Sequence, residues 1–136
     1  MTKTKAQQIM AATEVRAADD VTAAIRDIAA EFAPYIIKQR RHFHKHPELS
    51  LAEERTTSDI ANQLDAMNIP YERPLKTGLV ATLRGTAPDA YREDGTPRRR
   101  ILLRADIDAL PVTEQTGEEF ASVNEGCMHA CGHDCH

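Results

Sequence analysis

The last ten residues of the chain, CMHACGHDCH (127–136), contain all three of its cysteines and three of its six histidines. Thiolate and imidazole are the ligands that zinc and the neighbouring first-row metals prefer, so this density predicts a metal-binding role. Because a metal ion needs several ligands that converge in space, the segment also constrains how the rest of the chain folds around it. The candidate ligands are Cys127, His129, Cys131, His133, Cys135 and His136.

Two common kinds of Cys/His site do not fit the spacing. A closed structural zinc site usually takes ligand pairs from two separated segments, and no cysteine precedes Cys127. Covalent haem attachment requires C-x-x-C-H, whereas Cys127 and Cys131 are four positions apart. The spacing instead predicts a loop that supplies some ligands of a site, with the others coming from elsewhere in the fold. Gly132 favours this hypothesis, because its backbone freedom lets Cys131 and His133 converge on one ion.

The remaining Cys and His residues of the segment have alternative interpretations. Cys127 and Cys135 also fit ordinary unreactive thiols. His129 and His136 fit hydrogen-bond partners of metal ligands as well as ligands themselves. Their roles stay open at the level of the sequence.

Two carboxylates lie upstream, in RADIDALP (104–111). Asp106 and Asp108 follow the most apolar run of the chain, and residues two apart on a strand point to the same side. Polar groups at the carboxyl ends of strands in open α/β sheets often line a site. Asp108 therefore fits a residue that orients an imidazole ligand, whereas Asp106 fits a turn cap equally well.

A third cluster, RRHFHKHPELS (40–50), contains the other three histidines. His42 and His46 are one helical turn apart, which can bind a metal, but Pro47 disfavours the α conformation at His46. A packing role at the end of a helix is the better interpretation. No role follows for His44.

Helix-type spacing of apolar residues begins at Val21 and ends before Pro47, with Pro34 predicting either a kink or two abutting helices. A capping box, Ser50 to Glu53, predicts the start of a second helix that stops near Asn68. Three strands and one loop are then expected. The strands are IPYERPL (69–75), GLVATLRG (78–85) and RILLRADI (100–107), the last buried on both faces, and the loop is 86–100.

These elements predict an α/β class, with helices layered on a central sheet. The 136 residues suit one domain, yet they supply too few strands and helices to complete such a sheet, so a fragment is expected. The net charge of −4 disfavours nucleic acid as a partner. No long apolar run predicts a secretory signal or a membrane span, so a cytoplasmic protein with reduced cysteines is expected.

Four motifs, in this order, resemble the N-terminal third of the aminoacylase, hippurate hydrolase and indole-acetyl-amino-acid hydrolase family of dinuclear metal amidohydrolases. They are RRHFHKHPELSLAEERTT, GLVATLRG, LLRADIDALP and MHACGHDCH. The resemblance covers about residues 36–136. It implies that residues 19–136 form the N-terminal portion of the α/β catalytic domain, truncated before the lid or dimerisation domain, after a flexible or helical tail at 1–18.

The resemblance also implies site residues and a reaction. Cys131 and His133 correspond to metal ligands and Asp108 to the catalytic aspartate of the metal site. Asp106 stands where more distant relatives have a histidine ligand, and Cys135 where relatives have a small residue. A complete site would hold two divalent ions, of manganese, zinc, nickel or cobalt, and hydrolyse the amide of a small N-acyl amino acid.

In the family, the paired glutamates, further histidine ligands and the lid come later in the chain. This chain is therefore expected to be inactive by itself, and a homo-oligomer is expected only of a full-length protein. Two alternatives stay open. One is a non-catalytic metal-binding or interaction module built on the terminal cluster, and the other is a truncated product without a function of its own.

Overall fold

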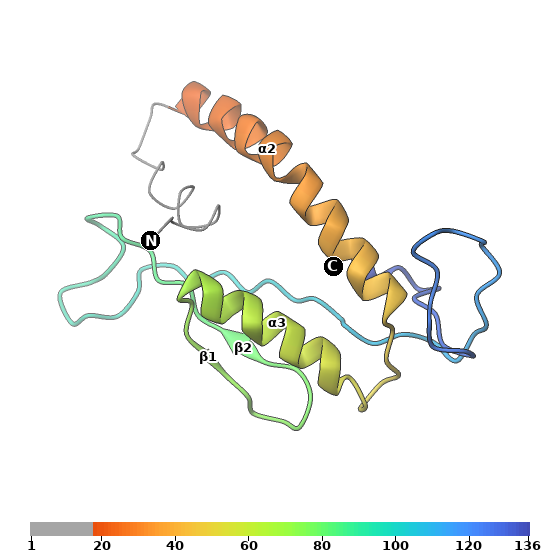
Figure 1. The fold of residues 1–136 in the computed structure, drawn as a ribbon. Helices are drawn as coiled ribbons and strands as arrows, with labels where there is room; N and C mark the ends of the chain where they lie inside the picture. Colours follow the sequence, from red (N-terminus) through yellow and green to blue (C-terminus); the bar gives the residue numbers. More distant parts are fainter. Residues whose placement is uncertain (1–17) are drawn as a thin grey trace.

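The computed structural model describes residues 18–136, so residues 1–17 of the expected tail lie outside the described residues. The elements are α2 (Ala18–Lys45), α3 (Glu54–Met67), β1 (Tyr71–Glu72), β2 (Val80–Ala81) and the short 3-10 helix η1 (His133–Cys135). Figure 1 shows the last segment of the chain returning to the C-terminal half of α2. Neither described helix combines the length and apolarity that crossing a membrane requires.

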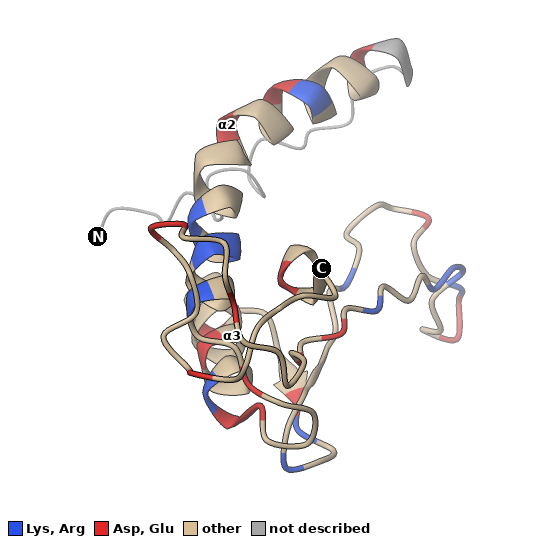
Figure 2. Ribbon diagram, turned by 90° about the vertical axis from the view of Figure 1, so that its right-hand side faces the viewer, with Lys and Arg blue, Asp and Glu red and all other residues tan. Residues whose placement is uncertain are grey.

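Helix α2 runs continuously through Pro34, but it bends (Figure 2). Proline cannot donate to the carbonyl of residue 30 and its ring crowds that turn, which accounts for a kink rather than for two helices. The helix ends at Lys45 because Pro47 disfavours a helical His46, as predicted.

Helix α3 is capped by a residue outside the predicted capping box. The helix begins at Glu54, and the N-cap Glu53 makes no side-chain hydrogen bond to it, so the capping-box prediction is wrong. The carboxylate of Glu48 instead accepts the backbone N–H groups of Arg55 at 3.1 Å and Thr56 at 2.7 Å. A turn with Leu51 at φ +67° brings Glu48 back to the helix end. The C-terminus matches the prediction, with Asn68 left-handed at φ 57°.

We expect Glu48→Ala to lower the free energy of unfolding by about 1–2 kcal/mol, because two N–H groups at the start of α3 lose their acceptor. Urea denaturation followed by helical circular dichroism measures this. Asn62→Ala, at an exposed position inside α3, is the matched control and should be neutral or slightly stabilising. An equal loss in both variants would contradict the capping role of Glu48.

The small sheet contains two antiparallel strands, with Tyr71 opposite Ala81 and Glu72 opposite Val80. The strands expected at 69–75 and 78–85 therefore form over two residues each. The loop expected at 86–100 contains its own tight turn, closed by the Arg92 N–H bonded to the Thr96 carbonyl at 2.8 Å.

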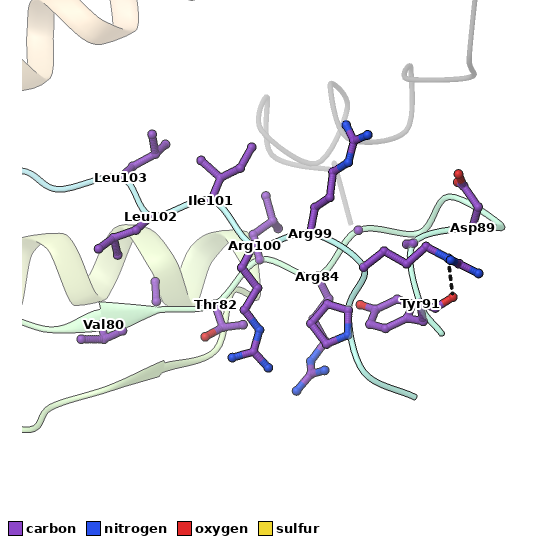
Figure 3. A pocket seen from close by; sticks show the side chains of 16 residues that line it. Val80, Thr82, Arg84, Asp89, Tyr91, Arg99, Arg100, Ile101, Leu102 and Leu103 are labelled. Carbon is purple, nitrogen blue, oxygen red and sulfur yellow. Dashed lines mark hydrogen bonds between the residues drawn. The ribbon is translucent and has the colours of Figure 1, made fainter. Parts of the chain in front are cut away.

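The prediction of a doubly buried strand at RILLRADI is wrong for this chain. Ile101, Leu102 and Leu103 are 86%, 88% and 90% exposed, and within residues 18–136 no strand pairs with them. A strand of this composition is buried only where other segments cover both of its sides. In the described chain the run instead lines a hollow of about 1210 Å³ together with the segment from Val80 to Gly85 (Figure 3). The hollow is not lined by any cysteine or histidine.

An exposed run of three aliphatic residues favours self-association. We expect Leu102→Lys to shift the chain toward monomer at a given concentration, measured by sedimentation velocity. Leu75→Lys, at a 73% exposed leucine outside this run, is the control and should change little. Identical sedimentation of wild type and Leu102→Lys over a wide concentration range would contradict the prediction.

The buried residues lie where the end of α2, the start of α3 and the 105–136 segment meet. The end of α2 and the segment after it are the centre of this region, because the carbonyls of Lys45, Pro47 and Glu48 all accept hydrogen bonds from 105–136. Most of the buried residues there are polar or small: His44, Pro47, Glu53, Thr56, Thr57, Ala61, Ala109, Cys127, His129 and Asp134. Burying polar side chains costs free energy, so their concentration in this region marks it as the candidate site.

Candidate metal centre

Backbone pairing brings the CGHD loop over the RADIDALP segment. The Ala109 N–H donates to the Glu48 carbonyl at 2.7 Å, and Leu110 and Met128 exchange two hydrogen bonds of 3.0 Å. Beyond Met128 the chain turns at Gly132, whose φ of +83° is left-handed and unfavourable for other residues. The turn leads into η1, which starts at His133.

Cys131 and His133 converge on Asp108. The Cys131 sulfur lies 3.8 Å from the Asp108 carbonyl oxygen, and His133 Nδ1 lies 3.2 Å from the same oxygen. His133 Nδ1 is also 2.9 Å from the Asp108 carboxylate. Both oxygens only accept, so Nδ1 carries the hydrogen and the lone pair of the neutral ring is on Nε2. This arrangement leaves Nε2 as the nitrogen that can bind a metal.

The environment of Asp108 keeps its carboxylate ionised. Burial by itself raises the pKa of this group, but the hydrogen bond from His133, followed by that from the backbone N–H of Asp108 itself, outweighs burial, and the net pKa is lowered. A permanent carboxylate is the group that best fixes an imidazole in one tautomer.

Asp106, like Asp108, lies close to His133. Ligand atoms of Asp106, His133 and His136 lie within 4.8 Å of one another, and the His133 and His136 rings stack at 5.1 Å. Asp106 also pairs with Arg104. Asp106 and His136, whose roles the sequence left open, therefore lie beside the predicted ligand His133.

His129 is a buried histidine whose ring nitrogens bear on whether a metal ion fits this region. It is 4% exposed, and neither ring nitrogen has a hydrogen-bond partner. Burial lowers the pKa of His129, so the ring is neutral and keeps a free lone pair. It borders a pocket of about 410 Å³ together with Cys131. An unpaired imidazole nitrogen that borders the same pocket as a cysteine suits a soft or borderline divalent ion.

The other two cysteines differ from Cys131 and from each other. Cys127 is buried, and burial raises the pKa of its thiol, which fits the interpretation as an unreactive thiol. Cys135 is exposed, with its sulfur 3.9 Å from Asp134. All three cysteines are free thiols.

Behind the CGHD loop lies a buried charged cluster that the sequence did not predict. Asp134 accepts from His44 Nδ1 at 2.8 Å and pairs with Arg40 Nε at 2.8 Å, and His44 Nε2 lies 3.0 Å from Glu114. The side chains of His44, Asp134 and Glu114 are 6%, 0% and 4% exposed. The only sequence signal was that Arg40 and His44, four residues apart, share one helix face.

Glu114 is ionised in this cluster. Burial by itself raises the pKa of the carboxyl group, but the backbone N–H of Ser122, the hydroxyl of Thr116 and His44 all bond to the carboxylate, and together they lower its pKa to about 2. His44 therefore faces a carboxylate on each ring nitrogen.

His42 and His46 do not take part in the centre. His42 pairs with Asp59 of α3 at 2.8 Å and its ring contacts that of His46 at 5.1 Å. Burial lowers the pKa of His46. This packing at the end of α2 agrees with the interpretation preferred from the sequence.

Comparison with known proteins relates this arrangement to metal-dependent hydrolases. Residues 102–136 match the family described as Peptidase family M20/M25/M40. An uncharacterized hydrolase of Staphylococcus epidermidis is 46% identical over 102 residues, which are 75% of this chain and 24% of that protein. The YXEP protein of Bacillus subtilis, described as a dinuclear metal binding peptidase from the M20 family, is 44% identical with a TM-score of 0.66, over 77% of this chain and 28% of that one. A protein from methicillin-resistant Staphylococcus aureus is 38% identical with a TM-score of 0.67, over 79% and 27%.

The chain is thus similar to a solved M20 peptidase, and the predicted α/β class is confirmed by two helices and a small sheet that resemble the two solved structures. It spans about a quarter of the length of the curated relatives that it matches.

Proposed function

We propose that residues 18–136 contribute metal ligands to a hydrolase that cleaves the amide bond of N-acyl amino acids, with Cys131 and His133 as ligands and Asp108 as the residue that orients His133. The observation that carries the proposal is the convergence of the Cys131 sulfur and His133 Nδ1 on one carbonyl, that of Asp108, within 3.8 Å. The similar proteins support the general activity in this proposal, that of a metal-dependent hydrolase. The four motifs support the N-acyl amino acid substrate.

The donor set supports two divalent ions. Cys131 offers a soft thiolate, His133 an imidazole nitrogen, and the neighbouring Asp106 and His136 further ligand atoms within 4.8 Å of His133. Manganese, zinc, nickel and cobalt all accept such ligands. When bound, the ions would lower the pKa of a water molecule and polarise the amide carbonyl.

The residues of this chain have separate tasks in the proposed site. Asp108 accepts the hydrogen bond of His133 Nδ1, which would leave Nε2 as the nitrogen that could hold a metal ion. Gly132 allows the turn that brings sulfur and imidazole to the same side of Asp108. A general base that moves the proton to the leaving amine would come from another segment.

A chimera tests the substrate class. Residues of this chain would replace the matching 28% of the YXEP protein, and the product would be assayed on hippurate, N-acetyl amino acids and dipeptides with manganese or zinc. Hydrolysis of the N-acyl amino acids, lost in the same chimera carrying His133→Ala, is expected. Hydrolysis of dipeptides alone would contradict the proposed substrate. The 136-residue chain alone should turn over below about 1 per second.

A non-catalytic metal module is the second candidate, favoured by the local concentration of ligand atoms from Asp106, His133 and His136. Such a module would bind one zinc ion tightly and gain folding stability from it. Zinc titration of the 136-residue chain with a rise in the midpoint of thermal unfolding would support this function over the hydrolase.

A further inference from the structure

His44 lies near the end of α2, the helix that leads into HPEL, and is not one of the proposed metal ligands. Its ring lies between two carboxylates, with Nδ1 2.8 Å from Asp134 and Nε2 3.0 Å from Glu114. Each ring nitrogen thus has a carboxyl oxygen within hydrogen-bond distance, and the ring links α2 to two loops.

Arg40 places a positive charge beside this cluster, with its Nε 2.8 Å from Asp134 Oδ2. The side chains of His44, Asp134 and Glu114 are buried, and removing one member of a buried hydrogen-bonded group leaves its partners unsatisfied. The edge of the Phe120 ring covers His44 at 5.5 Å.

The contact of His44 with Asp134 reaches the proposed metal loop directly. Asp134 follows His133, belongs to η1, and its side chain is 0% exposed. η1 packs on α2, and the two partners of this contact are 90 residues apart in sequence. Among the bonds found within residues 18–136, the loop side chain that reaches α2 is that of Asp134, which lies 2.8 Å from both His44 and Arg40. These two contacts hold η1, and with it His133, against α2.

We infer that His44 is a positioning residue for the metal site, holding the CGHD loop against α2 through Asp134 and the 113–122 loop through Glu114. This role rests on the proposed function, in which His133 and Cys131 bind metal. Partners that hold metal ligands in place typically change metal affinity by about 10- to 100-fold when they are removed.

The test uses His44→Gln in the full chain, followed by amide hydrogen exchange of residues 129–136 and by Co²⁺ titration. Glutamine can donate to only one of the two carboxylates and carries no charge. We expect exchange in 129–136 to rise about 10-fold or more, with residues 54–67 unchanged, and Co²⁺ affinity to fall about 10-fold. Unchanged exchange in 129–136 would overturn the inference.

The matched control is His42→Gln, which removes a histidine of the same helix that also bonds a carboxylate, that of Asp59. This variant should leave both the amide exchange of residues 129–136 and the Co²⁺ affinity unchanged. An equal effect in the two variants would mean general destabilisation and would overturn the inference.

Adding Glu114→Gln to His44→Gln provides a rescue. The double variant has no unpaired carboxylate at Glu114, and its two amides can bond to each other and to Asp134. Exchange should return to within about 3-fold of the wild type. Additive increases would mean that the three groups do not act as one unit, contrary to the inference. If the His44→Gln variant loses helical circular dichroism, the same exchange measurement is made on Asp134→Asn. Unchanged exchange of residues 129–136 in that variant would overturn the inference.

The two readouts separate the inference from the proposed function. If wild-type chain shows no cysteine-to-cobalt absorption, the proposed function fails, while exchange still decides whether His44 holds the loop. If wild type and His44→Gln bind Co²⁺ equally well, the inference fails and the proposed function remains.

Discussion

Replacing Cys131 with serine is expected to abolish the thiolate-to-cobalt charge-transfer absorption of the Co²⁺-loaded chain. It should also weaken Co²⁺ binding by on the order of 100-fold, because a soft anionic ligand is exchanged for a poorly coordinating hydroxyl. Cys131 is exposed, and its sulfur is 3.8 Å from the carbonyl that also contacts His133. Ultraviolet absorption during Co²⁺ titration measures both effects in one experiment.

Cys135→Ser is the control for this prediction, since Cys135 is also exposed and lies in the same loop. The absorption band and the affinity should persist in this variant. A band that survives in Cys131→Ser and disappears in Cys135→Ser would transfer the ligand assignment to Cys135 and would remove the main support for the proposed function.

The second large effect is an acid-dependent loss of stability that depends on Glu114. Its pKa falls on folding from 4.5 to about 2, so the unfolded chain binds more protons between these values. Stability from this group is therefore fully present above about pH 5 and is lost as the pH falls toward 2, by about 3 kcal/mol at most. Asp108 acts in the same direction, since its pKa is also lowered.

Urea denaturation at pH 6, 4 and 2.5 measures the effect. Glu114→Gln should be less stable than wild type at pH 6 and should lose much of the dependence on pH between 5 and 2. Glu119→Gln, at an exposed position of the same loop, is the control and should retain the wild-type dependence. A wild-type stability that stays constant from pH 6 to 2.5 would contradict the ionised state of buried Glu114.

Local features of the fold follow from the sequence. The spacing of apolar residues by three and four predicts α2 and α3, and the prolines predict the bend at Pro34 and the end before Pro47. The start of α3 was predicted with the wrong cap, because Glu48 reaches the helix only after a turn with left-handed Leu51. A capping motif records local spacing, and it does not record how the preceding turn folds back.

The apolar run RILLRADI demonstrates a different limit. Its composition reports that these residues prefer burial, but burial is supplied by neighbours that the run does not contain. In the described chain Ile101, Leu102 and Leu103 remain more than 85% exposed. The composition of a segment predicts whether it prefers to be buried, and the rest of the domain decides whether it is buried.

In the candidate site, the types of ligand were evident from CMHACGHDCH, and the turn at Gly132 followed from glycine alone. The sequence by itself thus determined which side chains can bind a metal and where the helices run, because both depend on residue chemistry and short spacings. Only the tertiary structure decided that Asp108 faces His133 across 25 residues and that His44 faces Asp134 across 90. Such pairings arise when distant segments pack together. A hydrogen bond requires its two atoms to lie within about 3 Å, and the sequence does not indicate which of its many carboxylates comes that close to a given histidine.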